Sequence, residues 1–249
     1  MNGDKKMDRL NDKVIAIFGA SGDIGSELAR VFHFSGAKLS LVARGEEKLQ
    51  VLASKLPDKG RVQVITADAS NEEDLLRVFE EIVTRYDRLD VVVISVGTHD
   101  WLTIDSDPAE AREMFGKHFQ SIFLPSAMVG LMAEQFFRAQ GGGLILSISS
   151  HAAVRTDLPR NLSYAPMKAA ARSFMLSLRS DLKDWPKVRI TDLQPAIVNT
   201  PSNAGALDTE EKRRKAVQPE EIAEWIIEHF YDPKIPAEKR FDAKDGLII

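Results

Sequence analysis

The chain contains no cysteine among its 249 residues. Disulfides, thiolate nucleophiles and cysteine-ligated metal sites are therefore excluded, and we expect no metal centre. No apolar run approaches the roughly twenty residues that a membrane-spanning helix needs. The net charge of −4 is too small to indicate binding to nucleic acid or to an anionic membrane. We therefore expect neither a nucleic-acid partner nor a membrane partner.

The composition is that of a globular protein, with 44% hydrophobic and 28% charged residues. Residues 1–12 are polar and charged and lack the apolar segment of a signal peptide, which favours a cytoplasmic location. Neither a repeat nor a linker divides the rest. We predict a flexible N-terminal tail over residues 1–12 and a single domain over residues 13–249.

Short β-branched and apolar runs alternate with longer amphipathic segments along the chain. The predicted strands are Val14–Phe18, Ala37–Ala43, Val62–Ala67, Val91–Ser95, Gly142–Ser149 and Val188–Leu193. The predicted helices are Asp23–Ser35, Glu46–Leu56, Asn71–Arg85, two stretches within Pro108–Arg138, Tyr164–Lys183 and Pro219–Tyr231. This alternation predicts an α/β fold with a doubly wound, mainly parallel sheet and helices on both faces.

Residues 200–218 form the least regular segment, at a position where such folds carry substrate loops. Within it, the charged run Glu210 to Lys215 is typical of a solvated helix face.

Glycines cluster between the first predicted strand and the first predicted helix, in Gly19-Ala20-Ser21-Gly22-Asp23-Ile24-Gly25. Glycine permits a tight turn and a close approach of the backbone to a ligand. The N-terminus of the helix that follows presents free N–H groups to a phosphate. In this first strand–helix unit, the pattern favours a dinucleotide site over a simple turn.

A phenol and an ammonium stand four residues apart in Tyr164-Ala165-Pro166-Met167-Lys168. On a helix, both side chains lie on one face, one turn apart. A nearby cation lowers the pKa of a tyrosine, which suits the phenol to exchange a proton with an alcohol or carbonyl oxygen.

Taken together, these motifs resemble the short-chain dehydrogenase/reductase family over about residues 12–230, nearly the whole chain. The glycine turn, an acidic residue after the third strand, Ser149-Ser150 after the fifth, Tyr-x-x-x-Lys and Pro-x-x-Val-x-Thr after the sixth follow the order and spacing of the family. The resemblance implies a single Rossmann-type domain. It also implies hydride transfer between a nicotinamide cofactor and a carbonyl or alcohol substrate.

The resemblance implies a catalytic set. Tyr164 would be the general acid in reduction and the base in oxidation, and Lys168 would lower the Tyr164 pKa and hold the nicotinamide ribose. The catalytic serine resembles Ser150, whose hydroxyl would stabilise charge on the substrate oxygen. Ser149 is the alternative, since the interval to Tyr164 allows a shift of one residue.

Charge after the second strand bears on the choice of cofactor. An acidic residue usually stands here in NAD-dependent folds, but this chain has Ala43 followed by Arg44. Arginine attracts a 2′-phosphate, so NADP(H) is favoured over NAD(H), and Ser21 could also reach that phosphate. Asp68, next to Ala69, resembles the aspartate that contacts adenine.

Further cofactor contacts implied by the resemblance lie farther along the chain. Thr200 resembles the residue that binds the carboxamide, Ile197 would offer backbone groups, and Pro195 begins that motif. Gly97 is the only residue of the usual Asn-Asn-Ala-Gly that is retained, since the stretch reads Ile94-Ser95-Val96-Gly97.

Other positions also depart from the family pattern. Phe18 replaces a threonine, Asp23 takes the place of the middle glycine, and Ala196 follows Pro195. His118 stands where the family has an asparagine that anchors a proton-relay water. His118 either relays protons itself, because its intrinsic pKa is near neutrality, or is a buried histidine that interrupts the relay.

The resemblance places the substrate between segments that follow the fourth, fifth and sixth strands. These include His99, Trp101, His151, Val154 and Leu158. Trp101 and Leu158 indicate an apolar component, although Trp101 could equally pack within its loop.

We expect an NADP(H)-dependent oxidoreductase that assembles as a homodimer or homotetramer. Apolar Leu247-Ile248-Ile249 would be available as an edge strand or a subunit contact. The alternative is a non-catalytic NADP(H)-binding regulator on the same fold. Retention of Ser150, Tyr164 and Lys168 argues against that alternative.

Overall fold

In the computed structural model, which describes residues 9–155 and 157–246, strands and helices alternate as the sequence predicts. Seven strands form one sheet: β1 (Val14–Phe18), β2 (Lys38–Ala43), β3 (Val62–Thr66), β4 (Val91–Ile94), β5 (Gly143–Ile148), β6 (Val188–Pro195) and β7 (Glu238–Phe241). Every neighbouring pair is parallel, in the order β3-β2-β1-β4-β5-β6-β7. The predicted doubly wound α/β fold is confirmed.

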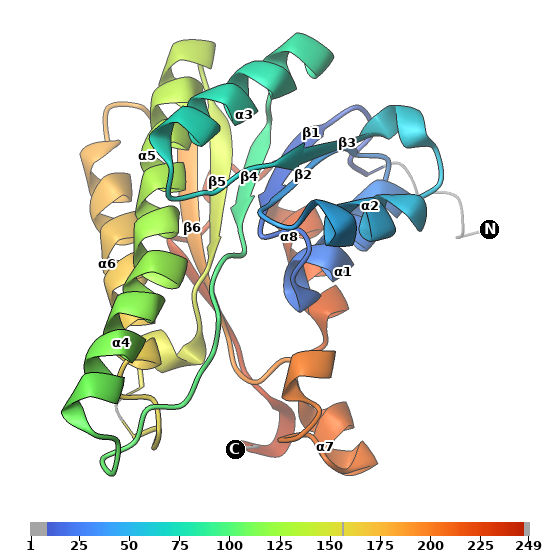
Figure 1. Cartoon of the computed structure of the whole chain (residues 1–249). Helices are drawn as coiled ribbons and strands as arrows, with labels where there is room; N and C mark the ends of the chain where they lie inside the picture. Colours follow the sequence, from blue (N-terminus) through green and yellow to red (C-terminus); the bar gives the residue numbers. More distant parts are fainter. Residues whose placement is uncertain (1–8, 156, 247–249) are drawn as a thin grey trace.

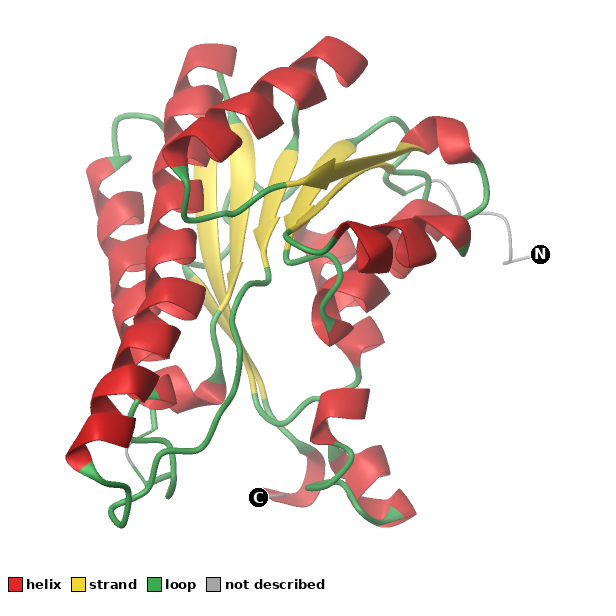
Figure 2. Cartoon of the chain, viewed as in Figure 1, coloured by secondary structure: helices red, strands yellow, loops and turns green. Residues whose placement is uncertain are grey.

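The helices cover both faces of this sheet (Figures 1 and 2). They are α1 (Asp23–Phe34), α2 (Glu46–Ser54), α3 (Glu72–Tyr86), α4 (Pro108–His118), α5 (Leu124–Gln140), α6 (Tyr164–Asp181), α7 (Glu210–Lys215) and α8 (Pro219–His229). One apolar layer packs beneath α1, α2 and α8 and includes Phe32 and Ile226. The other packs beneath α3, α5 and α6 and includes Val78, Phe137 and Met175.

The order of the strands reverses beside β1, because β2 and β3 lie on one side of it and β4 to β7 on the other. In such sheets the loops at the carboxyl ends of the strands diverge at this point and leave a crevice for a ligand. We therefore expect a ligand-binding crevice where β1 and β4 end, at Phe18 and Ile94.

A short π-helix, Phe119–Phe123, joins α4 to α5 directly after His118. Such π-turns are rare and often occur at functional sites. Ser126 stabilises the start of α5 by donating a hydrogen bond to the carbonyl oxygen of Ile122.

The edge strand β7 is not among the predicted strands. Its sequence, Glu238-Lys239-Arg240-Phe241, is largely charged, and charged side chains are common on the exposed edge of a sheet. It pairs with the end of β6, from Asp192 to Pro195. Residues 247–249, considered above as an edge strand or a subunit contact, lie outside the described residues.

The described part of the expected N-terminal tail is packed against the domain. The Leu10 side chain is fully buried in the layer beneath α1, and its N–H donates to the carbonyl oxygen of Ser35 at 2.8 Å. The ordered domain thus includes residues before Lys13. No helix in the described ranges is long and apolar enough to cross a membrane.

The packing of Leu10 can be tested by substitution. We expect Leu10→Ala to lower the free energy of unfolding by about 2–5 kcal/mol, because it removes a buried side chain and leaves a cavity. Asn11→Ala, at the exposed neighbouring position, is the matched control. Denaturant unfolding of the two variants checks this, and equal stabilities would show that residues before Lys13 contribute no core.

Candidate active site

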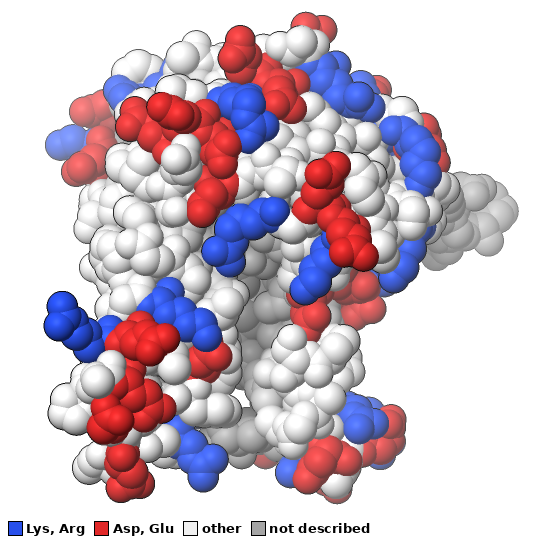
Figure 3. All heavy atoms as spheres, viewed as in Figure 1, with Lys and Arg blue, Asp and Glu red and all other residues white. Residues whose placement is uncertain are grey.

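A cleft of about 440 Å³ lies at the carboxyl ends of β1 to β4, where the order of the strands reverses. Figure 3 shows this face of the molecule hollowed between the part that carries α4 and the part that carries α1 and α7. Many predicted cofactor-binding residues line the cleft, namely Gly19, Ser21, Gly22, Arg44, Asp68, Ala69 and Gly97. The fold therefore brings together segments up to 106 residues apart, since the lining runs from Gly19 to Pro125.

The glycine turn is held by close contacts that leave no room for side chains. Gly19 has a φ of +82°, and a Cβ there would clash with the carbonyl oxygen of Ser95. A Cβ on Gly25 would clash with the carbonyl oxygen of Gly19. Gly22 caps α1 without a side-chain hydrogen bond, so the first N–H groups of that helix lack a side-chain cap.

Asp23, which stands in place of a family glycine, joins the turn to the segment after β6. Its carboxylate accepts a hydrogen bond from the backbone N–H of Ser202 at 2.9 Å. The adjacent Ile24 packs against the apolar layer under α1. The Asp23 side chain thus connects the start of α1 with the predicted substrate loop.

Cationic and acidic side chains lie at the end of the cleft near β2 and β3. Arg44 is exposed, and both it and Lys48 line the cleft together with Glu47. The carboxylate of Asp68 accepts hydrogen bonds from the N–H and the hydroxyl of Ser70, at 2.9 and 2.7 Å. Asp68 therefore stabilises its own turn while it also lines the cleft.

Lys168 is buried at the inner end of the site. Its Nζ donates to the carbonyl oxygens of Ile148, at 3.0 Å, and Val96, at 3.3 Å. Gly97 has a φ of +129°, and a Cβ there would lie 3.5 Å from the Lys168 Nζ and 3.1 Å from Ile122. Burial lowers the pKa of Lys168 to about 8, and the charge of Asp192 opposes this effect.

Tyr164 and Lys168 both lie on α6, one turn apart, as the spacing predicts. The Lys168 Nζ is 5.9 Å from the centre of the Tyr164 ring, and the Ser150 side chain lies beside the phenol. Burial raises the pKa of Tyr164 above its usual value, and the Ser150 hydroxyl opposes that rise. The expected lowering by Lys168 is not found here, because the ammonium is directed toward main-chain oxygens.

The two serines after β5 differ in their contacts. The Ser149 hydroxyl is buried and donates to Asp192 Oδ1 at 2.6 Å, so it points away from Tyr164. Ser150 instead meets the Tyr164 phenol, and its Oγ also accepts a hydrogen bond from the N–H of Ala152 at 3.1 Å. The Ser149 hydroxyl is thus engaged by Asp192, whereas Ser150 lies on the Tyr164 side of the strand end.

His118 is fully buried, and its ring lies edge-on to Tyr164 with centroids 6.0 Å apart. Its Nδ1 hydrogen-bonds the Ser163 hydroxyl at 2.9 Å, and its Nε2 lies 3.6 Å from the carboxylate of Asp100. Burial lowers the pKa of His118, and Asp100 opposes this shift. Both ring nitrogens thus face groups other than Lys168.

The motif after β6 is fixed by backbone hydrogen bonds. Pro195 ends the strand, and the carbonyl oxygen of Ile197 accepts from the N–H of Val217 at 3.0 Å. Thr200 is buried at the start of a short 3-10 helix, Pro201–Asn203. The charged run Glu210 to Lys215 forms the solvated helix α7, as predicted.

The substrate side of the cleft contains a contact that the sequence does not reveal. His99 lies edge-on to the rings of both Tyr164 and Trp101, with 4.5 Å between centroids in each pair. Its Nε2 is 3.2 Å from Asn161 Oδ1. The Trp101 side chain is half exposed, so it can both pack on His99 and contact a ligand.

His151, another predicted substrate-side residue, lies 3.1 Å from the Asp242 carboxylate.

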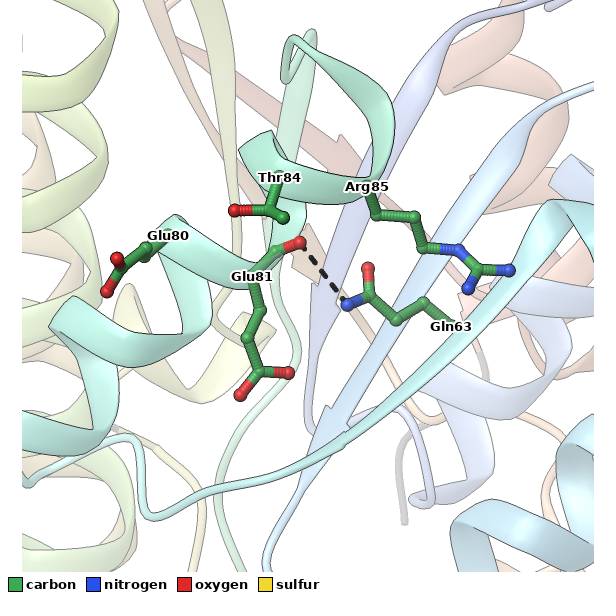
Figure 4. A pocket seen from close by; sticks show the side chains of 5 residues that line it. All are labelled: Gln63, Glu80, Glu81, Thr84 and Arg85. Atoms are coloured by element: carbon green, nitrogen blue, oxygen red, sulfur yellow. Dashed lines mark hydrogen bonds between the residues drawn. The ribbon is translucent and has the colours of Figure 1, made fainter.

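A second, shallower depression lies between β3 and α3 (Figure 4). Gln63 donates there to the carbonyl oxygen of Glu81 at 3.4 Å, and Arg85 donates to that of Gly60 at 3.1 Å. Main-chain oxygens already engage these donors, so we interpret this surface as packing at the sheet edge. Among the described residues, no cluster of three His, Asp or Glu could hold a metal ion.

Known proteins agree with this architecture. The family model described as short chain dehydrogenase matches residues 13–211. An uncharacterized oxidoreductase of Staphylococcus saprophyticus is 28% identical over 231 residues, which cover 91% of this chain and 94% of that protein. An 11-beta-hydroxysteroid dehydrogenase-like protein of Arabidopsis thaliana is 30% identical over 227 residues, which cover 90% of this chain and 74% of that protein.

Solved structures show the same fold. A 7 alpha-hydroxysteroid dehydrogenase complexed with NADH and 7-oxo glycochenodeoxycholic acid superposes with a TM-score of 0.82 and 20% identity, covering 99% of this chain and 98% of that one. A short chain dehydrogenase from Bacillus anthracis gives a TM-score of 0.80 at 18% identity, covering 93% and 95%. The chain belongs to the short-chain dehydrogenase family, whose members are oxidoreductases that use a nicotinamide cofactor.

The buried carboxylate of Asp192 predicts a pH-dependent stability. Burial raises its pKa to about 6, so the folded state favours the neutral acid more than the unfolded state does. The stability that Asp192 contributes is present below about pH 4 and is lost as the pH rises to about 6. We expect the melting temperature of Asp192→Asn, relative to wild type, to be several degrees higher at pH 7 than at pH 4.

Thermal unfolding of both proteins at the two pH values measures this difference. Ser147→Ala, at the buried position that pairs with Asp192 across β5 and β6, is the control and should show no such pH dependence. A constant difference between Asp192→Asn and wild type would contradict the raised pKa.

Proposed function

We propose that this protein is an NADP(H)-dependent oxidoreductase that interconverts a carbonyl and an alcohol, with Tyr164 as proton donor or acceptor. The observation that carries the proposal is the placement of Tyr164 and the buried Lys168 one turn apart on α6, with the Lys168 Nζ 5.9 Å from the centre of the phenol ring and the Ser150 side chain beside the phenol. The glycine turn and the 440 Å³ cleft fit a dinucleotide, because the close backbone packing leaves no side chain in its path. The bound nicotinamide would supply or accept the hydride.

Two side chains of the protein are proposed to hydrogen-bond and protonate the oxygen of the substrate. In reduction, the Ser150 hydroxyl would hydrogen-bond the carbonyl oxygen and stabilise its growing negative charge. Tyr164 would give that oxygen a proton. Since burial raises its pKa, Tyr164 holds its proton at neutral pH, which suits the role of acid.

The rim of the cleft supports NADP(H) over NAD(H). Arg44 and Lys48 line it near the end of β2, and Ala43 stands where an acidic residue would select NAD. We propose that Arg44 binds a 2′-phosphate, with the Ser21 hydroxyl beside it, while Asp68 and Ala69 border the adenine. Thr200, Ile197 and Pro195 are proposed to border the nicotinamide.

We propose that His118 positions the Tyr164 helix instead of relaying protons. Its Nδ1 holds Ser163, the residue directly before Tyr164, and its Nε2 faces Asp100. A proton relay through His118 would need a contact between His118 and Lys168. The Lys168 ammonium instead contacts main-chain oxygens.

The experiment that tests the function follows NADPH oxidation against a panel of aldehydes and ketones. The panel includes fused-ring ketones, because one relative and one structural neighbour are named for hydroxysteroids. We expect turnover by wild type and a loss of about 100-fold or more in Tyr164→Phe, which removes the acid. Phe119→Leu, outside the Tyr164 contacts, controls for aromatic substitution. Binding of NADPH without turnover of any carbonyl would favour a non-catalytic regulator.

The choice of cofactor depends on Arg44. We expect Arg44→Ala to weaken NADPH binding by about 10-fold or more, since a charge-assisted hydrogen bond contributes roughly 1.5–3 kcal/mol, and to leave NADH binding nearly unchanged. Lys55→Ala, which removes the same charge from the exposed end of α2, is the matched control. Fluorescence titration with each cofactor measures both affinities, and equal losses for NADPH and NADH would refute the phosphate contact.

The role of His118 is tested by His118→Leu. If His118 positions Ser163, we expect a lower kcat, by about 10-fold, with an unchanged pH–rate profile. Burial lowers the pKa of His118 below 6.5, so a relay would instead produce an acidic limb below pH 6.5 that the Leu variant lacks. Stopped-flow or steady-state rates between pH 5 and 9 distinguish the two.

A further inference from the structure

The carboxylate of Asp192 is buried near Lys168 but belongs to none of the groups proposed to touch the substrate or cofactor. Asp192 is fully buried in β6, where its Oδ1 accepts the hydrogen bond from Ser149 at 2.6 Å. Its second oxygen, Oδ2, is buried without a hydrogen-bond partner among the described residues. A buried carboxylate is unfavourable unless a positive charge compensates it, so its neighbours indicate what it does.

Asp192 faces the same helix that carries Tyr164 and Lys168. Side chains alternate along β6, and Val188 and Ile190 pack in the layer beneath α6. Asp192 follows on that face and pairs in register with Ser147 of β5. The Lys168 side chain extends from α6 to the same end of β5, where its Nζ donates to the carbonyl oxygen of Ile148.

The charged groups around this pair are few. Among the described residues, Asp192 is the carboxylate that acts on the Lys168 charge, and the centre of the Tyr164 ring lies 5.9 Å from the ammonium. Burial raises the pKa of Asp192, while hydrogen bonding by Ser149 and Gln194 and, more weakly, the charges of Lys168 and Arg172 from α6 oppose that rise.

The other polar groups near Asp192 have partners of their own. Gln194 of β6 and Arg172 both donate to Glu238 of β7, with 2.6 Å between Arg172 Nε and the Glu238 oxygen. Arg172 is therefore already paired with a second carboxylate, and of the two cations Lys168 has the larger electrostatic effect on Asp192.

The two charges stabilise each other. Burial lowers the pKa of Lys168 to about 8 and raises that of Asp192 to about 6, and each charge opposes the shift of the other. Between pH 6 and 8 both groups are therefore charged. Without the carboxylate, the Lys168 ammonium would lose its proton nearer to neutrality.

We propose that Asp192 is a positioning residue that keeps Lys168 protonated and turns the Ser149 hydroxyl away from the reacting oxygen, leaving that oxygen to Ser150. The catalytic part of this inference rests on the proposed function, in which Tyr164 exchanges a proton beside the buried Lys168. The electrostatic part concerns the two side chains alone and can be measured without substrate.

The test is a pH titration of the full chain labelled with ¹³C at the lysine Cε, followed by NMR. The Lys168 signal is assigned by its loss in Lys168→Met. We expect Asp192→Asn to lower the Lys168 midpoint by about one pH unit, as removal of a close opposite charge does. Asp192→Ser serves as a second variant. Thr191→Val, on the opposite face of β6, is the matched control and should leave the midpoint unchanged. An unchanged midpoint in both Asp192 variants would overturn the proposal.

The pH dependence of kcat provides the catalytic readout. In Asp192→Asn we expect the alkaline limb to move to lower pH by the same interval as the NMR midpoint, with a several-fold loss of kcat at pH 8. A shifted midpoint with an unmoved limb would overturn the catalytic part. A wild type that turns over no carbonyl would overturn the proposed function, while the NMR titration would still decide whether Asp192 holds the charge of Lys168.

Discussion

The arrangement of the site depends on holding one ammonium group inside the protein. Lys168 is only 6% exposed, and a buried charge is unfavourable unless oriented dipoles and opposite charges surround it. The carbonyl oxygens of Val96 and Ile148 supply the dipoles, Gly97 leaves the space, and Asp192 supplies the charge. These groups come from the segment after β4 and from β5 and β6, so the position of the ammonium follows from the order of the strands in the sheet.

Most of the fold could be predicted because the local signals agree with the global one. Strands such as Val91–Ile94 are uniformly apolar and buried on both faces, and each helix between strands shows its own polar face. The strand Glu238–Phe241 escaped prediction, since its charged residues obtain strand structure only by pairing with β6. The burial of Leu10 was not predicted either, because a lone leucine in a polar segment gives no hydrophobic periodicity to interpret.

The sequence predicts the placement of site residues where a motif fixes the backbone geometry. It predicts their contacts less well where these depend on the direction of a side chain. The glycine turn lines the cleft, and the spacing of Tyr164 and Lys168 places both on one helix, one turn apart. The different contacts of Ser149 and Ser150 required the structure, because successive residues after a strand point in different directions. The contact of His99 with Tyr164 joins residues distant in sequence. The role of Asp192 could not be predicted, because β6 also carries Arg189, Thr191 and Gln194 and only the structure shows that the Asp192 carboxylate is fully buried.

The central claim is that this chain transfers hydride from NADPH to a carbonyl carbon while Tyr164 protonates the oxygen. The most direct measurement uses NADPH deuterated at the transferable C4 position, with the carbonyl that responds in the panel, and mass spectrometry of the alcohol. The account predicts one deuterium on the carbinol carbon with wild type and almost no labelled alcohol with Tyr164→Phe. Alcohol formed without deuterium, or labelled equally by the Phe variant, would contradict it.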